Sequence, residues 1–391
     1  MNRLSIFASL VLLLALSNAC ITSQTAARLK SGSLTSGSFT DTIPFELRNG
    51  LIVVRAHLNG REMGMDFIWG SGEYGSKLSK EGAAYLGLSA EAEEGNFGRD
   101  IVLVDSIRLG DATVEGLAFQ LVTYPLRSPA RCIAEGGVLG SNFLRHCNWI
   151  IDYDQQHIIF SSLEQPLQAK PAHRIPFRRL GPFGRPAVKV QLNGYGKQEL
   201  IVDLGYIGGV YLNEKRVKKS ANAARYQDGV YQRLIGGPAV DGLLLDGGQL
   251  QAGSWEHTFQ ELRAGAGVSK LGSKVWQHYR VGLDYAREEL LLWPRSEGYT
   301  APLAPVLGWL PHYDEDGGVS VGFIVEGSPA WEAGLRLDDK IEVIDRRAAP
   351  AVFNDYCTYL SELHQRFGTA ERMSIKLKKM EQPVTLQANS Q

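Results

Sequence analysis

The sequence lacks several features that would each point to a particular class of function. After residue 20 it has no apolar run of the length that a membrane-spanning helix needs, about 20 residues. It has no basic excess, because 41 Lys and Arg residues stand against 42 Asp and Glu residues. Nucleic-acid-binding proteins normally carry such an excess, so no nucleic-acid partner is expected. The cysteines and histidines show no spacing typical of zinc sites, and neither a metal nor another cofactor is predicted.

Residues 1–20 have the pattern of an export signal. Arg3 supplies positive charge, an apolar segment follows, and residues 17–19 form a small-x-small cleavage site. Cys20 comes next, in an arrangement that resembles a bacterial lipoprotein signal, where that cysteine becomes the lipidated N-terminus. We therefore predict a signal peptide, lipidation at Cys20, a flexible tether over residues 21–38 and attachment to a membrane of the bacterial cell envelope. The alternative is an ordinary signal peptide cut at the same bond.

Three cysteines remain after the signal sequence, and export would permit disulfides between them. Cys132 and Cys147 lie in the same half of the chain. A bridge between these two is one alternative, and buried free thiols are the other. Spacing alone does not decide the state of these residues or of Cys357.

A long internal repeat organises the middle of the chain. Ile-Pro-Phe at residues 43–45 recurs at residues 175–177, which is 132 positions later. Residues 139–153 align without a gap on residues 271–285 at the same offset. A unit of this length that occurs twice indicates two related lobes, because solenoid repeats have periods of about 20 to 50 residues. Alternating apolar segments separated by turn signals such as Asn-Gly predict that both lobes are mainly β.

The most informative turn lies in the second copy. Residues 199–205 read Glu-Leu-Ile-Val-Asp-Leu-Gly, so an apolar strand delivers Asp203 to a turn that contains glycine. Asp is common at turns because its side chain hydrogen bonds to the local backbone. The turn is therefore evidence of a functional site only because of its place in the repeat.

Each copy resembles a lobe of the retropepsin and pepsin-like aspartic proteases. The resemblance rests on the strand that ends in Asp-Leu-Gly at residues 203–205 and on a Gly-ending segment before a short helix. That segment is Val-Leu-Gly at residues 138–140 and Lys-Leu-Gly at residues 270–272. The family implies two β-barrel lobes, over residues 39–165 and 172–295, that face each other across a cleft with one turn from each at its centre. It also implies that peptides or unfolded protein segments bind there.

The first lobe departs from this family where the first catalytic acid should be. Alignment forward from an Asn-Gly turn places Trp69 opposite Asp203, whereas alignment on Ser-Gly places Gly70 there. Neither residue is an acid, and the family's mechanism needs two carboxyl groups that share a proton. Leu204 is a second departure, because the family has a Thr or Ser hydroxyl there. Asp66 is the nearest acid, but it lies inside the predicted strand.

The last quarter of the chain resembles a PDZ domain of the kind that accompanies bacterial proteases. Residues 326–345 read EGSPAWEAGLRLDDKIEVID and carry most of this resemblance. It implies an α+β domain over residues 305–388 that binds extended peptides by adding a strand to a sheet edge. The residues expected at its groove come from one loop and one helix: Leu307, Gly308, Trp309, Leu310, Cys357 and Leu360.

Asp203 is the only candidate catalytic residue, and a catalytic unit that loses one member usually loses nearly all of its rate. The sequence therefore favours an exported, degenerate aspartic-protease-like protein that binds peptides or unfolded protein segments. The alternative is an active aspartic endopeptidase that uses Asp203 and recruits substrates through the PDZ domain. A second carboxylate within hydrogen-bonding reach of Asp203 would favour the enzyme.

Overall fold

The computed structural model is mainly β, as the sequence predicts. It describes residues 31–88, 101–124, 129–165, 167, 170–217, 223–229, 240–296, 299, 305–314, 316–352, 357 and 366–388. The predicted signal peptide, Cys20 and Leu360 lie outside these ranges. A search of the described residues finds no helix with the length and apolar character needed to cross a membrane.

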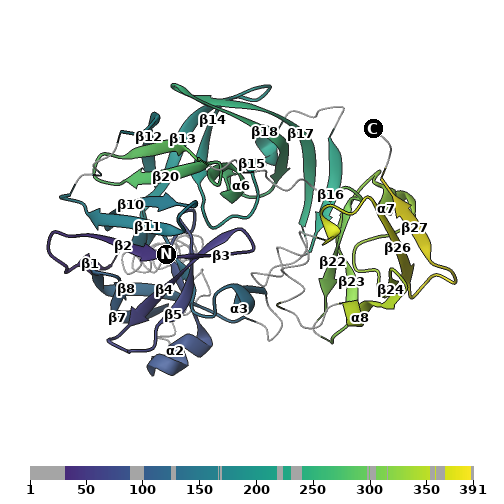
Figure 1. Ribbon diagram of the computed structural model, residues 1–391, viewed down its shortest axis with the longest axis horizontal. Helices are drawn as coiled ribbons and strands as arrows, with labels where there is room; N and C mark the ends of the chain where they lie inside the picture. The colour runs from purple at the N-terminus through teal and green to yellow at the C-terminus, as the bar shows by residue number, and fades with distance from the viewer. Residues whose placement is uncertain are drawn as a thin grey trace, which may run out of the picture.

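The first lobe, lobe 1, whose strands β4, β5, β7 and β8 are labelled in Figure 1, is built around a ring of strands that the pairings close. The ring runs β4, β7, β8, β6, β9, β5 and closes where β5 pairs with β4. The elements of lobe 1 are β1 (Ser33–Leu34), β2 (Thr40–Pro44), β3 (Glu46–Arg48), β4 (Leu51–Leu58), β5 (Met65–Trp69), β6 (Ser76–Ser79), α2 (Lys80–Leu86), β7 (Ile101–Leu109), β8 (Ala112–Val122), α3 (Pro129–Ile133), β9 (Gly137–Leu139), α4 (Ser141–Leu144), β10 (Cys147–Asp152) and β11 (His157–Ser162).

The second lobe, lobe 2, repeats this ring strand for strand. The ring runs β13, β17, β18, β15, β19, β14, and each pairing has the same direction as its counterpart in lobe 1. The prediction of two related lobes is therefore confirmed by the strand pairings. The elements of lobe 2 are β12 (His173–Leu180), β13 (Arg185–Leu192), β14 (Gly196–Val202), β15 (Val210–Asn213), the 3₁₀ turn η1 (Glu214–Arg216), β16 (Ala224–Asp228), β17 (Val240–Ala252), β18 (Trp255–Gly265), β19 (Lys270–Leu271), α6 (Ser273–Trp276), β20 (Tyr279–Asp284) and β21 (Glu289–Pro294).

One sheet joins the two lobes, and we call it the interlobe sheet. Its order is β2, β11, β10, β20, β21, β12, so each lobe contributes three strands. At the junction Ile150 lies opposite Gly282, and the pairs on either side are Trp149 with Leu283 and Ile151 with Val281. Because the repeat equates residues 149–151 with 281–283, the junction is symmetric about its central pair.

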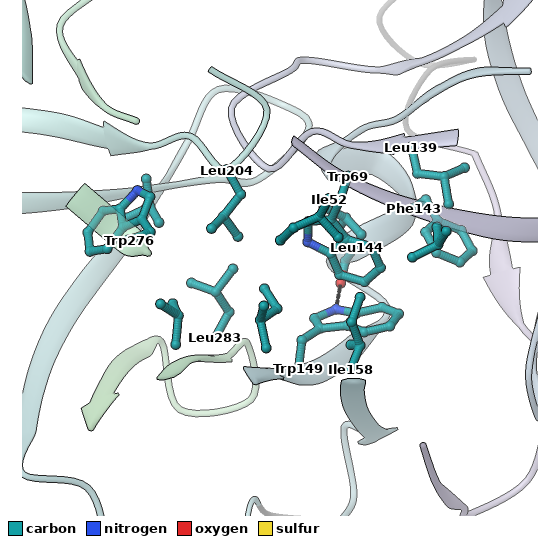
Figure 2. Packing of buried hydrophobic residues seen from close by; sticks show 14 of the residues in the cluster. Ile52, Trp69, Leu139, Phe143, Leu144, Trp149, Ile158, Leu204, Trp276 and Leu283 are labelled. Carbon is teal, nitrogen blue, oxygen red and sulfur yellow. Dashed lines mark hydrogen bonds between the residues drawn. The ribbon is translucent and has the colours of Figure 1, made fainter. Parts of the chain in front are cut away.

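The core of the molecule runs through both lobes without a break. Figure 2 shows Trp69 and Trp149 of lobe 1 packed in the same cluster as Leu204 and Leu283 of lobe 2. The rings of Trp69 and Trp149 meet edge to face, with their centroids 4.5 Å apart. Burial of apolar area on this scale is the main favourable term in folding, so the lobes are stabilised as one body.

The remaining strands form the C-terminal unit, which has its own apolar core. Its own sheet has the order β25, β24, β26, β27. A second pair of strands, β22 and β23, instead extends a sheet of lobe 2, because β23 pairs with β16. The elements are β22 (Trp309–Tyr313), β23 (Val319–Val325), α7 (Pro329–Glu332), β24 (Ile341–Ile344), β25 (Arg347–Ala348), α8 (Ala349–Val352), β26 (Arg372–Leu377) and β27 (Val384–Gln387).

Candidate functional site

The strand register shows that Gly70, and not Trp69, is the lobe 1 counterpart of Asp203. Gly70 donates its backbone N–H to the carbonyl of Leu139 at 2.9 Å, and Asp203 makes the same bond to Leu271 at 2.9 Å. Leu139 and Leu271 are equivalent in the repeat. Trp69 is fully buried and packs in the core, so its side chain takes no part in the cleft. The position of the expected first acid is therefore a residue with no side chain.

Asp203 lies at the end of β14, where the turn that follows holds its carboxylate. The Gly205 backbone N–H donates to Oδ1 at 3.1 Å, and the Lys270 ammonium donates to Oδ2 at 2.9 Å. Asp203 is only 4% exposed. Among the described residues these two are the hydrogen-bond donors to its carboxylate, so the group beside Asp203 is an ammonium and not a second carboxyl.

Lys270 reaches Asp203 because of its place on β19, the short strand that pairs in parallel with β14. Burial acts to lower the pKa of Lys270, but the charge and hydrogen bond of Asp203, together with the charge of Glu73, outweigh burial and raise that pKa. The ammonium also lies over the ring of Tyr206, at 4.8 Å from its centroid. Lys270 therefore keeps its positive charge in the cleft.

A comparison of the two copies of the repeat carries a signal for Lys270. The first copy of the repeat has Val138 at the start of its Gly-ending segment, and the second copy has Lys270 there. A lysine at a strand position that is apolar in the related lobe is expensive to bury unless a partner charge is near. Asp203 is that partner, on the adjacent strand.

A buried serine joins the two turns at the centre of the cleft. Ser71 donates its hydroxyl to the carbonyl of Val202 at 2.7 Å and accepts the backbone N–H of Leu204 at 3.0 Å. The equivalent residue in lobe 2 is Leu204, which has no hydroxyl and is buried in the core. The link between the lobes is thus made from one side, and the missing hydroxyl is replaced by apolar packing.

Gly72 lets the lobe 1 turn approach Asp203 closely. A Cβ atom at Gly72 would lie 2.1 Å from Cγ of Asp203, which is far inside van der Waals contact. No other residue type fits this position without a shift of the backbone or of Asp203. The two turns therefore meet directly, as the resemblance implies.

Asp66 does not replace the missing acid. It is 8% exposed and binds two arginines of lobe 1, Arg48 at 2.9 Å and Arg55 at 3.4 Å. Its backbone lies near the start of β5, opposite Arg55 on β4. These contacts make Asp66 part of a structural ion-pair cluster.

A cavity of about 390 Å³ contains the Asp203 carboxylate. Its charged lining includes a second ion pair that the sequence reading missed, between Glu73 and Lys77 at 2.8 Å. Glu73 comes three residues after Gly70, in the turn of lobe 1. Burial raises the pKa of Tyr206, another lining residue, so that its hydroxyl stays neutral. The cavity thus combines paired charges with neutral aromatic and apolar walls.

The residues expected at the C-terminal groove occupy two different environments. Leu307 and Trp309 are almost fully buried in the core of the C-terminal unit. Gly308 adopts a left-handed conformation, with φ of +74°, and its carbonyl accepts the N–H of Val325. Leu310 is also buried, and its side chain lines the cavity that contains Asp203. Whether these residues bind a peptide stays a prediction.

The cysteines differ from the pairing that the sequence reading considered. Cys132 forms a disulfide with Cys357, and Cys147 is a buried free thiol. The bridge spans 225 residues of sequence, which a reading based on short spacing does not find. It connects α3 of lobe 1 to the C-terminal unit, so Cys357 is an attachment point of that unit, and its expected contact with a peptide stays a prediction.

The sequence matches no protein-family model and no curated protein. Among solved structures, the chain is similar to a retropepsin-like aspartic protease from Rickettsia conorii, at 16% identity and a TM-score of 0.25, over 32% of this chain and 94% of that one. It is also similar to the aspartic proteinase from Irpex lacteus, at 9% identity and a TM-score of 0.39, over 66% of this chain and 98% of that one. The described residues by themselves establish a mainly β protein whose two related lobes meet at Asp203.

Proposed function

We propose that this protein is an aspartic-protease-like protein without peptidase activity, whose cleft binds peptides. The observation that carries the proposal is the ion pair between Asp203 and Lys270. The chemistry of such a cleft requires one carboxyl group to donate a proton while another accepts one. Here the first position is Gly70, and the group that faces Asp203 is a cation. An ion pair of this kind supplies no second carboxyl group for the proton transfers that peptide hydrolysis requires.

The lining of the cavity supports a peptide as the ligand. Apolar side chains from both lobes, including Ile68 and Ile207, lie beside the tyrosines and the charged pairs of the cavity. A mostly apolar pocket with a few fixed polar groups is the usual form of a binding site. Peptide side chains would contact the apolar walls, and peptide amides would hydrogen bond to the charged groups.

The test combines a cleavage assay with a binding assay on the mature chain. We expect no cleavage of an unfolded protein at mildly acidic pH, measured by mass spectrometry of the products, and measurable binding of labelled short peptides by fluorescence anisotropy. Ile207→Arg places a charge in the cavity wall and should weaken peptide binding by about tenfold or more. The matched control is Leu103→Arg, at a surface residue of lobe 1 that is 55% exposed. Equal binding by both variants would contradict a site in the cleft.

The alternative is an active peptidase, and Glu73 is the observation that favours it. Its carboxylate lines the same cavity as Asp203, and its charge contributes to the raised pKa of Lys270. If cleavage is observed and is abolished both by Asp203→Asn and by Glu73→Gln, this alternative replaces our proposal.

A PDZ-like role for the C-terminal unit belongs to the same proposal. Its support is the resemblance carried by residues 326–345. PDZ domains bind extended peptides by adding a strand to a sheet edge through backbone hydrogen bonds.

Export and lipid attachment are also proposed. The disulfide between Cys132 and Cys357 supports export, because disulfides persist in oxidising compartments outside the cytosol. The N-terminal mass of the mature protein, isolated from a bacterial host, tests the proposal. A diacylglyceryl-modified Cys20 as the first residue is expected, and an unprocessed Met1 would contradict it.

A further inference from the structure

The C-terminal unit is attached to both lobes. The disulfide from Cys132 to Cys357 fixes it to α3 of lobe 1. On the other side β23 pairs with β16 of lobe 2, over residues 226–228 and 323–325. Cys132 also packs against the core of the C-terminal unit. These attachments make the unit a fixed part of the molecule, whereas a recruiting arm on a linker would be free to move.

Figure 1 shows the C-terminal unit on the side of the two lobes opposite the interlobe sheet. Three of its residues, Pro305, Leu310 and Gly368, line the same cavity as Asp203. A peptide that extends from Asp203 in this direction would therefore meet the wall formed by Leu310. The cavity, at about 390 Å³, is at the small end of the range of ligand pockets, roughly 300 to 1,000 Å³.

We propose that the C-terminal unit restricts the cleft to short peptides and to the ends of longer chains, and that the Cys132–Cys357 disulfide holds the unit in this position. The inference rests on the proposed function of peptide binding. An internal segment of a long chain must enter the cleft and leave it again, and the wall blocks one of these two paths. A chain end or a short peptide needs only one path into the cleft, so the wall does not exclude it.

The disulfide is open to chemical control because Cys357 is exposed. A dithiol reductant cleaves the S–S bond, becomes oxidised to its own cyclic disulfide, and leaves thiols on Cys132 and Cys357. The attachment to lobe 1 then depends on noncovalent packing alone. The unit can move away from the cleft on the short β16–β23 pairing, and the path for a long chain opens.

The test compares two ligands with the same sequence. The first is a labelled hexapeptide that binds the full mature chain, and the second is that sequence placed in the middle of a long unfolded polypeptide. The oxidised wild type should bind the hexapeptide and exclude the embedded sequence. In Cys132→Ser/Cys357→Ser the embedded sequence should bind roughly tenfold more tightly or better, because the open state becomes populated. Cys147→Ala, which removes the buried free thiol, is the matched control and should behave as the wild type.

Reduction of the wild type with a dithiol provides the same comparison if the double variant does not fold. Equal binding of both ligands by the oxidised wild type would overturn the restriction and leave the proposed peptide binding intact. Continued exclusion of the embedded sequence after the disulfide is removed would overturn the role of the disulfide. Failure of every protein to bind the hexapeptide would overturn the proposed function, and this inference with it.

Discussion

Lys270→Met is expected to lower the free energy of unfolding by about 3 kcal/mol, because it leaves the Asp203 carboxylate buried without its partner. The side chains of Lys270 and Asp203 are 24% and 6% exposed, so solvent screens this pair weakly. Replacement of both partners, in Lys270→Met/Asp203→Leu, should recover most of the loss, since the apolar pair leaves no charge in the cleft. Urea denaturation of these two variants and of the wild type measures the difference.

The matched control is Lys376→Met. Lys376 binds Glu342 at 2.9 Å, but that carboxylate is 48% exposed, and loss of such a surface pair costs about 1 kcal/mol or less. A penalty for Lys270→Met no larger than that of Lys376→Met would contradict the ion-pair account.

The pair at Asp203 also predicts that stability depends on pH. Because the pKa of Lys270 is raised above its usual value of 10.5, the contribution of the pair to the free energy of unfolding is present below about pH 10.5. This contribution is lost as pH rises through the raised pKa.

Ser71→Ala should have an effect of similar size, about 3 kcal/mol, for a different reason. The hydroxyl of Ser71 bonds to the carbonyl of Val202 and to the N–H of Leu204, and removing it leaves both backbone groups buried without this partner. An unpaired buried donor or acceptor costs about 1 to 3 kcal/mol. Because the serine and its partners belong to different lobes, the loss should appear in the cooperative unfolding of the whole two-lobed body.

Ser273→Ala is the control for Ser71→Ala. Ser273 is also buried, and among the described residues its hydroxyl has no hydrogen-bond partner. Its removal should therefore change stability by less than about 1 kcal/mol, in either direction. If the two substitutions destabilise the protein equally, the lobes are not joined through the Ser71 hydroxyl.

The repeat made the two lobes predictable because alike sequences fold alike, and the aligned segments became α4 with β10 and α6 with β20. The residue of lobe 1 that corresponds to Asp203 could not be assigned from the sequence alone. A one-residue difference in spacing left Trp69 and Gly70 as alternatives, and only the backbone pairing to Leu139 separates them. Register is fixed by which face of a strand is buried, and here the core selects Trp69.

Two features of the site could not be obtained from local sequence. Lys270 and Asp203 are 67 residues apart, and the parallel pairing of β14 with β19 brings them together. The disulfide joins Cys132 and Cys357 across 225 residues and two folding units. The sequence instead suggests a pairing of Cys132 with Cys147, because these two cysteines share a lobe. Contacts of such long range depend on how the lobes and the C-terminal unit assemble, which neither spacing nor propensity encodes.

The symmetric junction between β10 and β20 bears on which differences the two halves of this cleft can carry. Two identical subunits form a junction of this kind around a twofold axis. In such a dimer any substitution occurs twice, so a glycine in place of the acid would erase both acids together. Because both halves belong to one chain, they differ independently: lobe 1 carries Gly70 at the turn, while lobe 2 carries Asp203 with Lys270 beside it.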